Sequence, residues 1–234
     1  MPNRDRRDRP LLAVLIDADN IPAKYAEAIL EEITGLGEPG LRRVYGDWSS
    51  DRLKPWASKV RDLGLVAHQE TANTKGKNAS DIGLVIDAMD VLHAGRFDGF
   101  VLVSSDSDFT RLASRIREDG LDVIGIGEGK APEALRNVCN RFILIENLTD
   151  DQPDAAAAKR KPQDALPLIL RAMERMDPGD DWYALGALGS QIIAEVPDFD
   201  TRTYGKRKLG DLIGDIKRLE TRMEGTQVMV RRRD

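Results

Sequence analysis

Cysteine and histidine are scarce in this sequence, which has one cysteine, Cys139, and two histidines, His68 and His93. A single cysteine excludes an internal disulfide and is typical of a protein from a reducing cytoplasm. With the two histidines far apart in the sequence, the Cys/His pattern of a zinc site is also excluded.

Long apolar runs are missing as well. No stretch approaches the roughly 20 apolar residues that span a bilayer. The first ten residues, MPNRDRRDRP, are charged and lack the apolar run of a signal peptide. We therefore expect a cytoplasmic protein with no membrane association, in which residues 1–10 form a flexible arm. A hydrophobic content of 41% and a charged content of 32% are enough for a globular core and a soluble surface.

The net charge of -5 argues against binding to nucleic acid, but the charge is unevenly distributed. Residues 159–234 hold fifteen Lys/Arg and thirteen Asp/Glu, whereas residues 1–158 hold twenty and twenty-seven. An acidic part followed by a mildly basic part suggests two roles. An acidic site that binds divalent cations would also present less negative charge than this count implies.

Apolar strands alternate with amphipathic helices over residues 11–148. The expected strands are 11–17, 41–48, 65–70, 99–109, 121–127 and 141–148. The expected helices are 23–33, 52–64, 81–95, 110–120 and 132–139, with loops at 35–40 and 71–80. Unbroken apolar strands that alternate with helices predict an α/β, Rossmann-like parallel sheet with helices on both faces.

A second domain is expected after a linker at residues 149–163, which is rich in Pro, Ala and charge. Three helical patterns follow, at 165–176, 182–195 and 208–220, and residues 226–232 read as a closing strand. This order predicts a small winged-helix-type unit over residues 164–232.

Acidic residues stand where an open α/β sheet places its active site. Asp17 and Asp19 follow the first strand, Asp106 and Asp108 follow the strand VLVSS, and Asp81 opens a helix. Ligands bind at the carboxyl ends of parallel strands, near a switch in strand order. Carboxylates brought together there repel one another unless a cation intervenes. Hard oxygen ligands of this kind suit Mg²⁺ or Mn²⁺.

Several of these residues have a purely structural alternative. Asp17 is the least ambiguous, because a lone carboxylate at the end of a buried strand is costly. Residues that could instead cap helices or sit in loops are Asp19, Asn20, Asp81, Asp106 and Asp108. Asp87 lies farther along its helix and points away from Asp81, so a solvated position is favoured for it.

Four segments together resemble the NYN (LabA-like) branch of the PIN-like nucleases. They are VLIDADN, NASDIGLVIDAMD, VLVSSDSDF and GIGEGKAPEALRNVCNRFILIENL, and the likeness covers residues 11–148. The resemblance implies a metal-dependent ribonuclease with a PIN-like fold. The residues it implies as catalytic and metal-binding are Asp17, Asp81, Asp106 and Asp108, with Asn20 and Ser105 orienting ligands or substrate. A further late acidic residue, common in such families, has only Glu128 and Glu133 as candidates.

Two loops contain glycine, as phosphate-binding loops do. Lys75 and Lys77 precede the helix that contains Asp81, where backbone N–H groups and two lysines could hold an RNA phosphate; a solvated loop is the alternative. GIGEGK, residues 125–130, matches neither the P-loop nor the dinucleotide fingerprint and is interpreted as a turn.

The segments LGALGSQI and PDFDTRTYGKRKL resemble the OST-HTH/LOTUS domain over residues 164–232. The resemblance implies a winged-helix module that binds RNA. The candidate RNA contacts are Arg202, Tyr204, Lys206, Arg207 and Lys208. Alternatively Tyr204 and Trp182 are core aromatics, which is the favoured interpretation for Trp182. The apolar faces of ILRAM and IIAE could instead bind a protein partner.

The combined hypothesis is a Mg²⁺- or Mn²⁺-dependent endoribonuclease whose C-terminal module recruits RNA. One alternative is a non-catalytic RNA-binding adaptor. A second alternative, a receiver-like phosphotransfer domain, is disfavoured because such a domain has a lysine at the end of a late strand, and here Lys130 comes only after the glycine turn. A third alternative, a binder of small nucleotides, is disfavoured because the sequence lacks a phosphate-binding loop.

Overall fold

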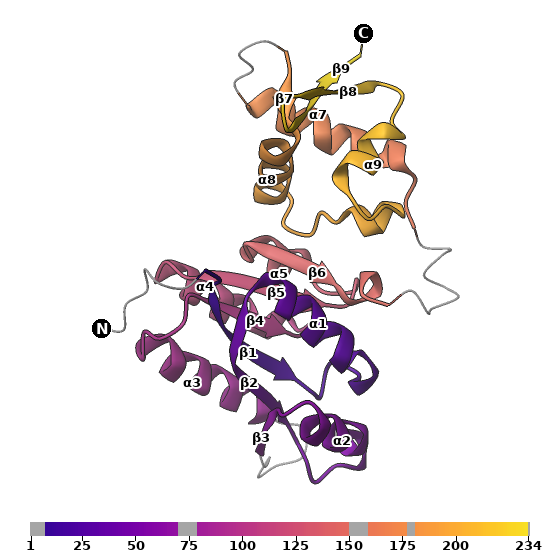
Figure 1. Ribbon diagram of the computed structural model, residues 1–234. Helices are drawn as coiled ribbons and strands as arrows, with labels where there is room; N and C mark the ends of the chain where they lie inside the picture. The colour runs from indigo at the N-terminus through magenta and orange to yellow at the C-terminus, as the bar shows by residue number, and fades with distance from the viewer. Residues whose placement is uncertain (1–7, 70–78, 150–158, 177–180, 234) are drawn as a thin grey trace. The chain divides into compact units, whose positions relative to one another are not determined.

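The structure is a computed structural model that describes residues 8–69, 79–149, 159–176 and 181–233. The chain divides into two compact units, Met1–Thr149 and Asp150–Asp234. Each unit has a β-sheet of its own, as Figure 1 shows. In the parts of the chain that are described, no helix combines the length and apolar character needed to cross a bilayer.

The N-terminal unit is built on a parallel sheet of six strands in the order β3-β2-β1-β4-β5-β6. The strands are β1 (Leu11–Asp17), β2 (Glu38–Gly46), β3 (Val66–Gln69), β4 (Gly99–Val103), β5 (Asp122–Gly127) and β6 (Arg141–Leu144). The order reverses between β1 and β4, since the chain builds outward from β1 to β3 and then returns to the other side of β1. The predicted Rossmann-like fold is therefore confirmed.

Helices cover both faces of this sheet. They are α1 (Ala26–Leu36), α2 (Lys54–Asp62), α3 (Ala79–His93), α4 (Thr110–Glu118) and α5 (Glu133–Val138). The short 3₁₀ helices of this unit are η2 (Ala23–Tyr25), η3 (Asp51–Leu53), η4 (Ser107–Phe109) and η5 (Ile145–Asn147).

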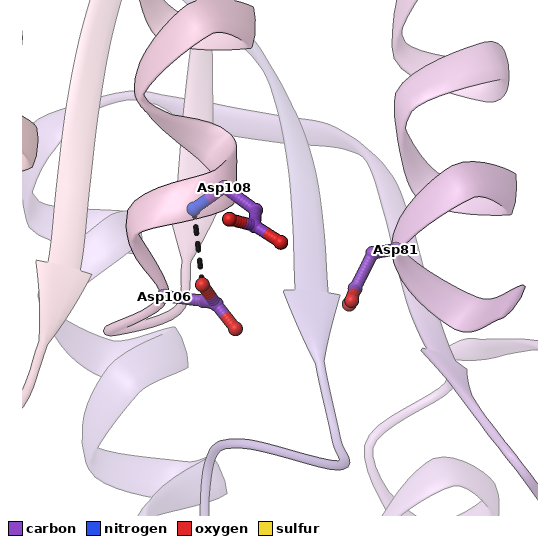
Figure 2. A group of neighbouring side chains, drawn as sticks. All are labelled: Asp81, Asp106 and Asp108. Carbon is purple, nitrogen blue, oxygen red and sulfur yellow. Dashed lines mark hydrogen bonds between the residues drawn. The ribbon is translucent and has the colours of Figure 1, made fainter. Parts of the chain in front are cut away.

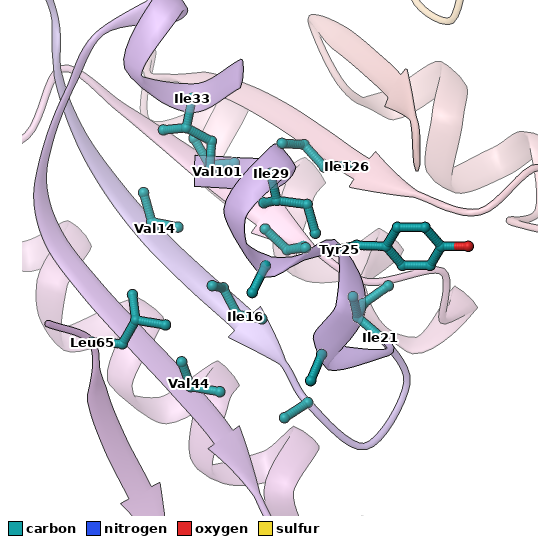
Figure 3. Packing of buried hydrophobic residues seen from close by; sticks show 14 of the residues in the cluster. Val14, Ile16, Ile21, Tyr25, Ile29, Ile33, Val44, Leu65, Val101 and Ile126 are labelled. Atoms are coloured by element: carbon teal, nitrogen blue, oxygen red, sulfur yellow. The ribbon is translucent and has the colours of Figure 1, made fainter. Parts of the chain in front are cut away.

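Alternating residues of β1 divide the interior into two cores. Val14 and Ile16 pack with Ile29 and Ile33 of α1 on one face of the sheet (Figure 3). Ala13 and Leu15 pack on the other face, against buried residues of α3, α4 and α5. Because both faces of β1 are covered, its apolar run is unbroken until Asp17.

The beginning of the unit differs from expectation in two places. Arg9 and Pro10, expected in a flexible arm, have defined contacts: the carbonyl of Pro10 accepts from the Glu38 amide of β2 at 2.8 Å, and Arg9 donates to the Gly37 carbonyl at 3.2 Å. The expected loop at 35–40 is instead the end of α1 and the start of β2. Gly40 lies at a register irregularity in β2, where a Cβ atom would be 2.5 Å from Leu11 Cδ1 and the Leu11 side chain would have to move.

The C-terminal unit has helices and a three-stranded antiparallel sheet in the order β7-β9-β8. Its elements are η6 (Pro162–Ala165), α7 (Leu166–Arg175), β7 (Tyr183–Ala184), α8 (Leu185–Glu195), η7 (Thr201–Tyr204), α9 (Leu209–Gly214), β8 (Leu219–Glu224) and β9 (Gln227–Arg232). Three helices, a short first strand and a closing hairpin form the expected winged-helix arrangement.

Two element predictions for this unit were wrong. The helix expected at 208–220 ends at Gly214, and β8 follows from Leu219. The helix expected from residue 182 starts at Leu185, because Tyr183 and Ala184 pair with β9. In both places, strand pairing with β9 overrides the local helical pattern.

Candidate metal centre

The candidate site lies at the carboxyl ends of β1 and β4, where the strand order reverses. Asp17 is the last residue of β1, and Asp106 follows β4 by three residues. Asp81 lies in the first turn of α3. This crevice is where an open α/β sheet binds ligands.

Three of the predicted carboxylates come together. Asp81, Asp106 and Asp108 each offer an oxygen atom, and these atoms all lie within 4.8 Å of one another. Figure 2 shows Asp81 on α3 facing the turn that carries Asp106 and Asp108. Burial raises the pKa of Asp81 first, and the nearby charges of Asp106 and Asp108 raise it further. We refer to these three residues as the acidic trio.

Asp106 has a structural role as well. Its Oδ1 accepts a hydrogen bond from the Asp108 amide at 3.0 Å, so it is the N-cap of η4. The cap holds the two carboxylates in one turn. Asp106 therefore caps a helix, as the structural alternative predicts, and is also one of the clustered carboxylates.

Asp17 is beside the acidic trio but is not part of it. Its side chain is 3% exposed and accepts hydrogen bonds from Ser104 Oγ at 2.8 Å and the Asn20 amide at 3.2 Å. Burial raises the pKa of Asp17 to about 7 despite the Ser104 hydrogen bond, and the charges of Asp81 and Asp19 add to the rise. A buried carboxylate with this pKa has a strong electrostatic reason to bind a cation nearby.

Ser104 connects Asp17 to the acidic trio and was not identified from the sequence. Its hydroxyl donates to Asp17 and accepts from the Asp106 amide at 3.1 Å. The serine pair directly after a buried strand is the sequence signal for this role, but the family resemblance implies a role for Ser105 alone. One hydroxyl thus holds the end of β1 against the loop that follows β4.

The predicted ligand-orienting residues brace the backbone. Asn20 Oδ1 accepts from the Ser105 amide at 3.1 Å, and Ser105 Oγ accepts from the Glu128 amide at 2.8 Å. These contacts join the loops after β1, β4 and β5. Asn20 and Ser105 therefore shape the rim of the site, and their contact with substrate stays a prediction.

Asp19 does not cap a helix, because the N-cap of η2 is Pro22. Its Oδ2 accepts from the Asp47 amide at 3.2 Å, and its Oδ1 lies 3.7 Å from Arg52 Nη2. Oδ1 is buried and has no hydrogen-bond partner within the described part of the chain. Asp19 thus adds a further carboxylate at the edge of the acidic trio.

The remaining predicted residues of this unit lie elsewhere. Lys75 and Lys77 fall outside the described residues. Glu128 forms an ion pair with Lys130 at 2.5 Å, and Glu133 is exposed in α5. Asp87, predicted to be solvated, instead accepts from Tyr45 and pairs with Arg43, because α3 packs against β2.

The donor chemistry fits a hard divalent cation. The acidic trio supplies carboxylate oxygens, which Mg²⁺ and Mn²⁺ prefer. Burial is the largest cause of the raised pKa values of Asp17 and Asp81, and the charges of neighbouring carboxylates raise both pKa values further. A cation at the acidic trio would relieve this repulsion.

The C-terminal candidates form a mixed set. Tyr204 is 4% exposed and packs on Phe199 with ring centroids 5.8 Å apart, which favours the alternative that it is a core aromatic. Arg202 is held by both carboxylate oxygens of Asp200, at 3.0 and 2.6 Å. Its charge is therefore largely used within the domain.

Lys206 pairs with Asp215 at 2.5 Å, whereas Arg207 and Lys208 are exposed. The apolar faces considered for a protein partner are mostly internal, because Ile169, Met173 and Ile192 belong to the buried core.

The fold and the acidic trio define a doubly wound α/β protein with a carboxylate-rich site at its switch point. Residues 11–146 match the NYN domain model, and the chain belongs to the NYN family, which lies among the PIN-like nucleases. Residues 158–230 match the OST-HTH/LOTUS domain model, an RNA-binding module.

Comparison with solved structures supports the fold alone. A protein of unknown function from Vibrio parahaemolyticus is 20% identical, with a TM-score of 0.52, over 62% of this chain and 98% of that chain. MurG of Acinetobacter baumannii is 10% identical over 88% of this chain and 70% of that chain, and its TM-score of 0.39 supports no inference. No curated protein matches the sequence.

Proposed function

We propose that the protein is a metal-dependent endoribonuclease that hydrolyses RNA phosphodiesters at the acidic trio. The observation that carries the proposal is the convergence of Asp81, Asp106 and Asp108 beside Asp17 at the switch point of the sheet. Membership in the NYN family and the OST-HTH domain support a nuclease that acts on RNA.

In this proposal the acidic trio holds Mg²⁺ or Mn²⁺. When bound, the cation would polarise the scissile phosphate and make a nearby water more acidic. Asp17, fixed by Ser104, adds negative charge behind the trio and strengthens cation binding. Ser104 and the η4 cap hold Asp17, Asp106 and Asp108 in fixed positions relative to one another. This limits the reorganisation that is needed when substrate binds.

The test is a cleavage assay of the full chain on labelled single-stranded RNA and DNA with Mg²⁺, Mn²⁺ or EDTA. We expect RNA to be cut with either cation and left intact in EDTA. Asp106→Asn and Asp17→Asn should each lower the rate at least 100-fold, which is about 2.7 kcal/mol in activation free energy. Both variants should keep the fold, because each replaces a carboxylate by an amide of the same size.

Asp90→Asn is the matched control, since Asp90 is exposed on α3, the helix that carries Asp81. It should cut at the parental rate. If Asp17→Asn and Asp106→Asn cut RNA as fast as the parent with Mn²⁺ present, the proposed catalytic site is wrong. Titration calorimetry with Mn²⁺ adds an independent result, because absence of binding would favour an RNA-binding adaptor instead.

A further inference from the structure

A tryptophan covered by two arginines lies on the sheet of the C-terminal unit. Trp182 directly precedes β7 and is half-buried, outside the hydrophobic core of this unit. The guanidinium carbons of Arg222 and Arg231 lie 4.2 and 4.7 Å from its ring centre. Both distances are within the range of cation–π attraction. The core position predicted for Trp182 was therefore wrong.

Strand register explains how these three residues meet. Tyr183 pairs with Val230, so Trp182 lies beside Arg231 on the neighbouring strand. Val230 is buried against the core, and its neighbour Arg231 therefore points to the opposite side of the sheet. Arg222, on β8, reaches the same ring from the other side of β9. We call Trp182, Arg222 and Arg231 the Trp–Arg face.

Positive charge in this unit is concentrated in and around the β8–β9 hairpin. Residues 217–233 hold six Lys/Arg and two Asp/Glu, whereas the whole segment 159–234 holds fifteen and thirteen. The basic residues of the hairpin region are Lys217, Arg218, Arg222, Arg231, Arg232 and Arg233. Outside this region, acidic residues outnumber basic ones. A polyanion would therefore be attracted to the hairpin.

The two arginines of the face are accessible. Arg222 and Arg231 have side chains that are 43% and 45% exposed. Arg222 pairs with Glu224 at 2.7 Å, and Arg231 pairs with Glu220. The Arg222–Glu224 pair is exposed on both sides, so it contributes little and can be exchanged for a phosphate. The Arg231–Glu220 pair is open on the arginine side, whereas the Glu220 side chain is 23% exposed. Arg202 differs, because its partner Asp200 is only 9% exposed.

We propose that the Trp–Arg face binds single-stranded RNA, which deepens and rests on the RNA-directed function proposed above. A guanidinium that lies over an indole can still direct its N–H groups at phosphate oxygens, and a free face of its plane can stack on a base. Aromatic and arginine platforms of this kind suit unpaired bases. A duplex hides its bases, and an acidic protein surface would not use the stacking planes.

The experiment measures binding of the full chain to a fluorescein-labelled oligouridine of about 12 nucleotides by anisotropy, in EDTA. Arg222→Gln/Arg231→Gln should weaken binding at least tenfold and lower the slope of log affinity against log salt by about 1.4, at roughly 0.7 for each charge lost against a single strand. Arg222→Lys/Arg231→Lys keeps the charge and loses the planar groups, so it should fall between the parent and the Gln variant.

The matched control is Arg171→Gln/Arg175→Gln, which removes two exposed arginines from α7 of the same unit. It should bind within about twofold of the parent, because its charges lie outside the hairpin. A thermal melt of each variant checks that the fold is retained.

Three outcomes overturn the proposal: parental affinity in the hairpin Gln variant, an equal loss in the α7 control, or equally tight binding of a duplex of the same length. If Arg222→Gln/Arg231→Gln binds RNA with parental affinity, a protein becomes the favoured partner of the Trp–Arg face. Because binding is measured in EDTA, the result stands apart from the cleavage assay. A chain that binds RNA here but does not cut it would disprove the nuclease alone.

Discussion

Asp17 is the residue with the greatest electrostatic conflict in the described part of the site. Its carboxylate is buried at the end of β1, and two hydrogen bonds only partly compensate for lost hydration. The pKa of about 7 means that Asp17 is largely protonated below neutral pH when no cation is bound. The ionised Asp17 carboxylate thus destabilises the folded protein at the same position where its charge would favour a bound cation.

The pKa of Asp17 predicts a pH-dependent stability. Because the folded-state pKa lies above the usual 3.8, the folded protein binds more protons than the unfolded chain between these values. The cost of ionising Asp17 is therefore absent below about pH 4, grows toward pH 7 and is constant above it. In EDTA, Asp17→Asn should stabilise the protein at pH 8, on the order of a few kcal/mol, and much less at pH 4.5.

Chemical denaturation at both pH values measures this difference. Asp47→Asn is the control, because the hydrogen bond from the Ser49 hydroxyl lowers the pKa of Asp47 instead of raising it. This variant should show no gain at pH 8. An Asp17→Asn gain that is equal at both pH values would contradict the proposed ionisation.

At the scale of elements, the site depends on the close approach of β5 to the end of β4. Gly127 is the last residue of β5, and a Cβ atom there would lie 2.6 Å from the Ser104 carbonyl and 3.0 Å from Ser105 Oγ. Ser104 holds Asp17 and the Asp106 amide. Space at one glycine therefore decides the position of the loop that carries two carboxylates.

Gly127→Ala should displace this loop, because the nearest obstacle is backbone and cannot rotate away. We expect a loss of about 1–3 kcal/mol in the free energy of unfolding and at least tenfold weaker Mn²⁺ binding by calorimetry. Gly35→Ala is the control, since no atom lies within 4 Å of a Cβ there, in α1. It should be neutral or gain up to about 1 kcal/mol. Parental Mn²⁺ affinity in Gly127→Ala would show that the loop tolerates the methyl group.

At the scale of the whole molecule, an NYN unit and an OST-HTH unit share one chain. Each would bind RNA modestly by itself, because the N-terminal unit is acidic and the C-terminal charge is concentrated in one hairpin. An RNA long enough to contact both units turns the second contact into an intramolecular event. The substrate length should therefore matter more for KM than for kcat.

We expect KM to fall at least tenfold as single-stranded RNA is lengthened from roughly 5 to 30 nucleotides. Steady-state kinetics with Mn²⁺ on a length series measures this effect. In Arg222→Gln/Arg231→Gln the length dependence should be largely lost, while the α7 control Arg171→Gln/Arg175→Gln should keep it. A parent enzyme with one KM for all lengths would rule out cooperation between the units.

The amino-acid sequence by itself determined the layered α/β architecture, the winged-helix type of the second unit and the acidic ends of β1 and β4. These features follow from apolar periodicity and strand-end composition, which are local properties of the chain. The family resemblance added that four of these acidic residues belong to one site, namely Asp17, Asp81, Asp106 and Asp108. Even the wrong boundaries at 35–40 and 208–220 left the order of the main layers unchanged.

Only the tertiary structure decided which side chains meet. It separated buried Asp17 from the acidic trio, introduced Ser104 as their connection, buried Tyr204 and brought two arginines onto Trp182. These outcomes depend on strand register and on contacts between residues as much as 87 positions apart, such as Asp17 and Ser104. Local patterns specify the type of each element, whereas packing between elements selects the partner of each side chain.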